Sequence, residues 1–191
     1  MTRRLRSQGF FFLLDALENV PDDLANKINV VIASRLIDQH TMDRITKLSE
    51  RYLSVFFADG YAHDELDDLL GDVDLGVVPV LWEDNLPQVA IEMHARHIPL
   101  LTSDLGGAQE LGNCNDLVFT AGDTKDFAAK LKTVLDGKIS VKDYWTSAMA
   151  PYSMQDHLSE LMRVYEAPAR AIQRLPSGEQ QKGKKELSLH D

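Results

Sequence analysis

Apolar and amphipathic segments alternate along most of this chain. Residues 28–34 form a continuous apolar run, which is typical of a strand buried on both faces. Other apolar runs predict strands at 53–60, 74–80, 98–103 and 117–120. Helical spacing of apolar residues predicts helices at 10–19, 41–52, 64–70, 87–97 and 124–138. Strands and helices in this order predict an α/β fold with a doubly wound, Rossmann-like parallel sheet.

The pattern changes toward the carboxyl terminus. The helix at 124–138 is expected to be capped by Asp123 or Thr124 and to stop near Gly137. Two further helices are predicted at 141–148 and 154–166, and the sequence then becomes polar. We therefore predict one domain at 1–166, long enough to bury a core, followed by a flexible tail at 167–191.

Composition narrows the cellular setting. Hydrophobic residues make up 44% of the 191 residues and charged residues 26%, as in ordinary globular proteins. No run of 18 apolar residues predicts a membrane span, so a peripheral contact at the inner membrane face is the most that we expect. Cys114 is the single cysteine, which excludes a disulfide framework and favours the reducing cytoplasm.

The negative charge is concentrated in one part of the chain. The formal net charge is −10, and residues 52–95 contain ten acidic residues and no lysine or arginine. Nucleic acids are bound mainly through cationic contacts to their phosphates. A nucleic-acid partner is therefore not expected.

Polar residues gather where two neighbouring strands are predicted to end. The strand at 74–80 leads into an acidic loop with Asp84 and Asn85, and the helix that follows carries Glu92. The next strand ends in a Gly106-Gly107 turn. The carboxyl ends of parallel strands border the usual ligand crevice of open α/β sheets. Carboxylates and a glycine turn at this edge predict a site for a polyhydroxylated, phosphorylated ligand.

These residues also form a recognisable motif. Asp84-Asn85-Leu86-Pro87, with Glu92 eight positions after Asp84, resembles the Glu-x7-Glu signature of retaining glycosyltransferases of family 4. The resemblance extends over about residues 3–137, and it includes ARHIPLLTSDLGGAQE, where His97 replaces a common glycine. It implies the nucleotide-sugar-binding, carboxyl-terminal half of a GT-B fold, here with extra carboxyl-terminal helices.

Two positions near the amino terminus depart from the family's pattern. The family carries an Arg-x4-Lys pair that neutralises the donor diphosphate; Arg3 matches the arginine, but Gln8 stands where lysine is expected. The family's first strand and its amino-terminal acceptor domain, which precede this pair, have no counterpart in the sequence. The resemblance therefore implies the donor-binding half of a transferase, with an acceptor domain on a partner chain as one arrangement.

The resemblance also implies a role for each site residue. Asp84 would contact hydroxyls of the donor sugar and Glu92 the nucleotide ribose, and these two are the expected catalytic residues. Backbone N–H groups of Asn85 and Leu86 would line the phosphate and sugar pocket, and Pro87 is a further expected donor-binding residue. The expected base-binding residues are Gly60 and Tyr61.

The implied reaction is transfer of a sugar from UDP-sugar or GDP-sugar to a glycan or lipid-linked acceptor in polysaccharide biosynthesis. The family retains the anomeric configuration without a metal or other cofactor. One alternative is a non-catalytic nucleotide-sugar-binding module or subunit of a split glycosyltransferase, motivated by Gln8 and the missing acceptor domain. Another is a sugar-nucleotide epimerase of the same overall fold, whose motifs are not evident.

Each site residue also has a purely structural interpretation. Asp84 or Asn85 could be a helix N-cap, with Pro87 in the first turn. Glu92 could face solvent, and the two glycines could form only a tight turn. No metal site is expected, because the histidines lack metal-ligand spacing with partner acids: His63, His94 and His97. Ser103-Asp104 forms no credible hydrolase triad, and no G-x-S-x-G motif occurs.

Overall fold

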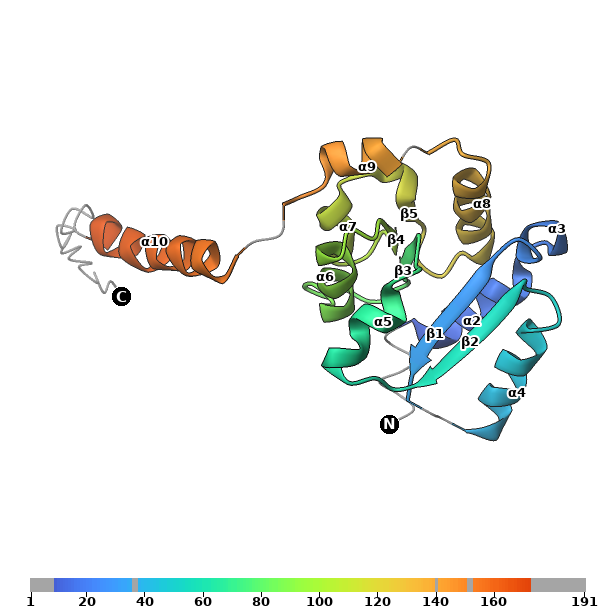
Figure 1. Ribbon diagram of the computed structural model, residues 1–191. Coiled ribbons are helices and arrows are strands. Elements are labelled where there is room, and N and C mark those ends of the chain that lie inside the picture. Colours follow the sequence, from blue (N-terminus) through green and yellow to red (C-terminus); the bar gives the residue numbers. More distant parts are fainter. Residues whose placement is uncertain (1–8, 36–37, 140, 151–152, 173–191) are drawn as a thin grey trace, which may run out of the picture. The chain divides into compact units, whose positions relative to one another are not determined.

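The computed structural model describes residues 9–35, 38–139, 141–150 and 153–172 (Figure 1). The chain divides into two compact units, Met1–Pro151 and Tyr152–Asp191. Arg3 and Gln8, for which the sequence predicts contacts with the donor, lie outside the described residues.

The first unit contains two parallel sheets. β1 (Asn29–Ser34) pairs with β2 (Ser54–Asp59) over their full lengths. The second sheet has the order β3-β4-β5, with bounds Gly76–Val78, Leu100–Ser103 and Val118–Phe119. All five predicted strands are present and parallel, which confirms the α/β, Rossmann-like fold class (Figure 1). β3 is shorter than predicted and stops before Pro79, which has no N–H to donate to a sheet.

Helices connect the strands in this unit, and two of them have side-chain N-caps, of which only the one at Asp123 was predicted. Asp38 accepts a hydrogen bond from the Thr41 amide at the start of α4. Asp123, one of two predicted caps, accepts bonds from the amides of Lys125 and Asp126 in α8. The helices of the first unit are α2 (Phe10–Asn19), α3 (Asp22–Ala25), α4 (Gln39–Leu48), η1 (His63–Glu65), α5 (Leu66–Leu70), α6 (Gln88–Ala95), α7 (Ala108–Gly112), η2 (Asn115–Leu117), α8 (Thr124–Leu135) and α9 (Val141–Ser147).

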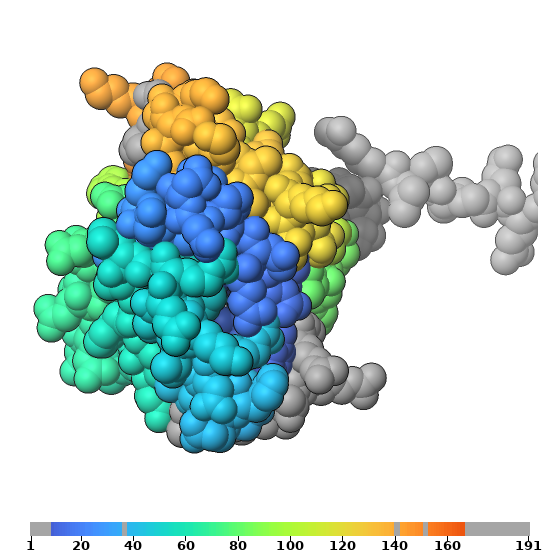
Figure 2. All heavy atoms as spheres, turned by 90° about the vertical axis from the view of Figure 1, so that its right-hand side faces the viewer, coloured from blue at the N-terminus to red at the C-terminus, as the bar shows by residue number. Residues whose placement is uncertain are grey.

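Helix α2 lies at the centre of the main core. Phe12 on α2 stacks on Phe119 of β5, with ring centroids 5.8 Å apart, and the edge of Phe127 on α8 meets both rings. Helix α2 packs against α8, and Figure 2 shows blue amino-terminal residues beside yellow ones. The amino end of α2 lies against the carboxyl end of β3: a side chain at Gly9 would come within 1.6 Å of the Pro79 carbonyl oxygen. Helix and strand ends thus converge at one edge of the fold.

One prediction about the strands is wrong. The continuous apolar run of β1 predicts burial on both faces. However, Val31 is 41% exposed, and its partner Phe56 on β2 is 58% exposed. Ile32, which points to the opposite face, is 3% exposed. The reason is the small sheet: among the described residues, core helices cover only the Ile32 face of β1 and β2.

The second unit contains α10 (Met154–Ile172). This helix continues beyond the predicted 154–166 to Ile172. The side chains of residues 153–166 are exposed. The rest of the predicted tail, 173–191, lies outside the described residues. Among the helices described, none is long and apolar enough to cross a membrane.

Candidate functional site

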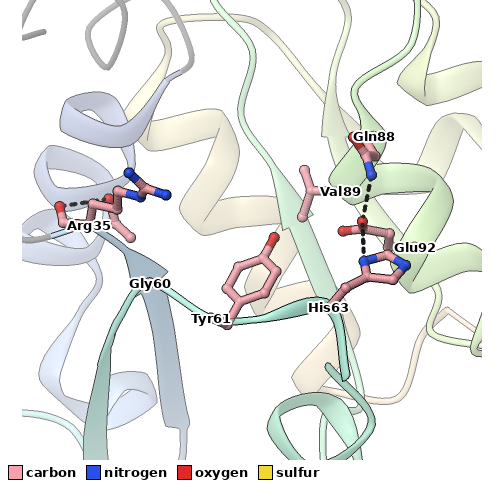
Figure 3. A pocket seen from close by; sticks show the side chains of 8 residues that line it. Arg35, Gly60, Tyr61, His63, Gln88, Val89 and Glu92 are labelled. Carbon is pink, nitrogen blue, oxygen red and sulfur yellow. Dashed lines mark hydrogen bonds and ion pairs between the residues drawn. The ribbon is translucent and has the colours of Figure 1, made fainter. Parts of the chain in front are cut away.

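A cavity of about 390 Å³ lies where β1 and β2 end and α6 begins (Figure 3). Ligand sites of open parallel sheets lie at this edge. The volume falls within the range of small-molecule pockets. The residues that line the cavity are Ser34, Arg35, Gly60, Tyr61, His63, Gln88, Val89 and Glu92.

The ends of β1 and β2 form one wall of the cavity. The Gly60 amide donates to the Ser34 carbonyl oxygen at 2.9 Å, which continues the parallel ladder by one residue. Gly60 has a φ of +74°, a conformation that a side chain disfavours. The turn directs the chain away from the sheet and brings Tyr61 into the cavity (Figure 3). Gly60 and Tyr61, predicted as base-binding residues, therefore both line it.

Glu92 lies on the opposite wall, with only 11% of its side chain exposed. Gln88, one turn earlier on α6, donates to a Glu92 carboxylate oxygen at 2.9 Å. The His63 Nδ1 atom lies 3.6 Å from the same oxygen. Burial and the nearby Glu92 carboxylate both raise the pKa of Tyr61. The carboxylate therefore faces the cavity, where its acceptor oxygens are available to hydroxyl groups, and the solvent-facing interpretation of Glu92 is wrong.

The acidic loop rests on the Gly106-Gly107 turn. The Gly107 amide donates to the Asp84 carbonyl oxygen at 3.0 Å. A Cβ atom at Gly106 would come within 2.5 Å of that oxygen, and one at Gly107 within 1.9 Å of the Asn85 carbonyl oxygen. The glycines therefore do more than form a tight turn, because they let two loops from neighbouring strands pack backbone against backbone. Asp84 itself is half-buried and is not among the residues that line the cavity.

Helix α6 begins at the cavity without a side-chain cap. Its N-cap is Pro87, and no side chain accepts a hydrogen bond from its first turn. The interpretation of Asp84 or Asn85 as an N-cap is therefore wrong. Gln88 and Val89, the first two residues of the helix, line the cavity. Uncapped N–H groups and the positive end of the helix dipole favour an anion at this position.

The structure brings part of the predicted site together. Glu92, Gly60 and Tyr61 share the cavity, whereas the exposed Asn85 and Leu86 lie on the loop before α6. Sequence reasoning missed the other lining residues. Two of them carried a usable signal: Arg35 directly follows β1 at its carboxyl end, and Gln88 precedes Glu92 by one helical turn.

His63 lines the cavity, whereas His94 lies in structural surroundings. His94 is 2% exposed, its Nε2 atom lies 2.8 Å from the Met149 carbonyl oxygen, and its Nδ1 atom lies 3.3 Å from the Tyr144 hydroxyl. These contacts join α6 to α9 and the residues after it. Within the part of the chain that the structure describes, no three His, Cys, Asp or Glu residues are grouped to hold a metal ion.

The parallel sheets, the cavity at their carboxyl edge and the uncapped helix define the chain as a Rossmann-like domain with a ligand crevice. A family model described as "Glycosyl transferases group 1" matches residues 1–137, so the chain belongs to that family. The glycosyltransferase resemblance is thereby confirmed at this level.

A solved structure supports the fold. The crystal structure of HepE (Alr3699) from Anabaena in complex with UDP matches with a TM-score of 0.57 at 16% identity. The match covers 89% of this chain and 46% of HepE, so the chain spans about half the length of that protein. At this identity the likeness establishes the fold alone. No curated protein matched the sequence.

Proposed function

We propose that the chain is the donor-binding domain of a glycosyltransferase that moves a sugar from UDP-sugar or GDP-sugar to a glycan or lipid-linked acceptor. The observation that carries this proposal is the position of Glu92, a mostly buried carboxylate in the wall of a cavity at the strands' carboxyl ends. Membership of the group 1 glycosyl transferases supports it. The UDP in the HepE crystal structure favours a nucleotide ligand.

The geometry suggests how a nucleotide sugar would lie. Glu92 accepts hydrogen bonds from the ribose hydroxyls, because one carboxylate has oxygens for two adjacent hydroxyl groups. Tyr61, which is 40% exposed, offers its ring face to the base beside Gly60. The uncapped start of α6 binds phosphate oxygens through backbone N–H groups.

The donor sugar extends from the phosphates toward the acidic loop. Asp84 binds its hydroxyls there, and Asn85, Leu86 and Pro87 complete the pocket. We assign Arg3 and Gln8 to the diphosphate from the resemblance, with Gln8 as a neutral contact.

The proposed chemistry requires no metal ion. The bond between the anomeric carbon and the diphosphate oxygen breaks, and the acceptor oxygen forms its bond on the same face of the sugar, so that the configuration is retained. The departing phosphate takes the acceptor's proton. The protein's contribution is to hold the donor and to stabilise the diphosphate, which is where most catalytic free energy is gained in such reactions. The acceptor-binding part lies in another domain or on a partner chain.

Calorimetric titration of two variants tests the assignment of the carboxylates. Glu92→Gln is expected to weaken the binding of both free nucleotide and nucleotide sugar, because both contain the ribose. Asp84→Asn is expected to leave the binding of free nucleotide unchanged and to weaken only the binding of nucleotide sugar. Loss of a charge-assisted hydrogen bond costs roughly 1.5–3 kcal/mol, about ten- to a hundredfold in affinity.

A matched control separates local from general effects. Glu50→Gln removes an exposed carboxylate just after α4, outside the cavity, and is expected to leave both affinities unchanged. Circular dichroism must show all three variants folded. Equal effects of Glu92→Gln and Asp84→Asn on both ligands would contradict the two assignments. Binding only in the presence of a divalent metal would contradict the metal-independent mechanism.

A non-catalytic nucleotide-sugar-binding subunit of a split transferase is the second candidate. It is favoured by Gln8, which supplies no positive charge where the family has lysine. This candidate predicts that the chain binds the donor but never releases its sugar, even when it is mixed with an acceptor-domain partner. Release of sugar from UDP-sugar or GDP-sugar by the chain would exclude it.

A further inference from the structure

Arg35 differs from the other arginines whose side chains the structure describes. Four of them pair with carboxylates, at nitrogen-to-oxygen distances of 2.7 Å or less: Arg44, Arg51, Arg96 and Arg163. Arg35 makes no such pair with any described residue, although the chain carries a net charge of −10. An arginine without a carboxylate partner in so acidic a protein has its full charge available to another anion.

The position of Arg35 directs this charge to the cavity. Arg35 directly follows β1, and its Cγ atom lies 3.6 Å from the place that a Cβ atom on Gly60 would take. Its side chain therefore passes beside the turn after β2 and lines the cavity. None of the other lining residues is a lysine or arginine. Figure 3 shows Arg35 on one side of Tyr61 and Glu92 on the other.

We propose that Arg35 binds the phosphate oxygens of the nucleotide and supplies the positive charge that Gln8 does not. The inference rests on the proposed function and deepens it. A guanidinium group matches two phosphate oxygens at once, which makes arginine well suited to this contact. Arg35 thus becomes a donor-binding residue in addition to those that the sequence suggests.

The charges in the cavity orient the ligand. The Glu92 carboxylate repels phosphate and accepts hydrogen bonds from hydroxyl groups, so the ribose lies on the Glu92 side of the cavity. The phosphates then lie toward Arg35, within reach of the uncapped start of α6 at Gln88 and Val89. Two elements distant in sequence, the end of β1 and the start of α6, therefore share the diphosphate.

A comparison of nucleoside with nucleoside diphosphate tests the assignment. Calorimetric titrations with uridine, UDP, guanosine and GDP are performed on the native chain and on Arg35→Gln, Arg35→Lys and Lys27→Gln. Lys27 is a matched control, because it is exposed and precedes the amino end of the same strand. Its replacement removes the same charge at the opposite end of β1.

Arg35→Gln is expected to weaken diphosphate binding by about ten- to a hundredfold and to leave nucleoside binding within about twofold. Arg35→Lys should restore part of the loss, because lysine keeps the charge but not the planar fork. Lys27→Gln should match the native chain. Equal losses for nucleoside and diphosphate would overturn the proposal and assign Arg35 to the base.

Two other outcomes separate this inference from the proposed function. Native binding of a diphosphate that Arg35→Gln leaves unchanged would overturn the Arg35 assignment alone. No binding of either diphosphate by the native chain, at millimolar concentrations, would overturn both.

Discussion

Replacing Gly107 with alanine should weaken nucleotide-sugar binding, although Gly107 itself does not line the cavity. Gly107 has a φ of −82° and a ψ of −6°, which alanine adopts readily, so the backbone itself does not require glycine. What requires it is the contact with the acidic loop. A Cβ atom would stand 1.9 Å from the Asn85 carbonyl oxygen, so that oxygen must move by about 1.5 Å to reach an ordinary contact. The movement also strains the hydrogen bond from the Gly107 amide to Asp84.

The expected loss in the free energy of unfolding is about 1–3 kcal/mol, the usual cost of overpacking. Urea denaturation measures this loss, and calorimetry should show a nucleotide-sugar affinity lowered by about tenfold or more, because the loop is displaced. Gly122→Ala is the control. Gly122 has a φ of +81° and no atom within 4 Å of its added Cβ, so alanine costs only backbone strain, about 1–2 kcal/mol, and affinity stays native.

Two results would refute the reasoning about the glycine turn. One is a Gly107→Ala chain whose unfolding free energy lies within about 0.5 kcal/mol of native, since overpacking of this size must cost more. The other is a native affinity for nucleotide sugar in that variant, because the turn would then not position the loop.

Three further predictions concern stability. Burial raises the pKa values of Tyr52 and Tyr144 to about 12, so folding opposes their ionisation, and stability should be constant below pH 10 and fall by on the order of 1–2 kcal/mol for each as pH rises to 12; a melting temperature that stays constant to pH 12 would contradict this. His94→Phe should cost about 2 kcal/mol in urea, because it leaves the Tyr144 hydroxyl and the Met149 carbonyl without this partner; a neutral effect would refute the role of His94. Arg44→Ala breaks two ion pairs to α2 and should cost about 1 kcal/mol at low salt and less at 1 M salt; an effect that salt leaves unchanged would point to packing instead.

The periodicity of apolar residues was sufficient to predict the strands and most of the helices. It failed for β1, because an apolar run indicates that a strand can be buried and not whether a second layer exists to bury it. Val31 and Phe56 illustrate this, because both are apolar residues that suit a core, yet both are exposed in the structure. The short helices α3 and α7 were missed because four or five residues carry too little periodicity.

The part of the candidate site that belongs to a sequence motif could be predicted. The spacing from Asp84 to Glu92 identified the carboxylate that the structure places in the cavity. Arg35 belongs to no motif, and its lack of a carboxylate partner is visible only once the ion pairs of the other arginines are known. The supporting role of Gly107 is likewise hidden, because it arises from a close approach between loops that are 22 residues apart in sequence.

We propose that a nucleotide binds where β1, β2 and α6 meet. Titration of the ¹⁵N-labelled chain with UDP or GDP, observed through its backbone amide resonances, tests it most directly. We expect the largest shifts, in the presence of EDTA, at the amides of Gly60, Tyr61, Gln88 and Val89, while the amide of Lys27 at the opposite end of β1 stays unchanged. Shifts concentrated away from this cavity, or none with either nucleotide at millimolar concentration, would contradict it.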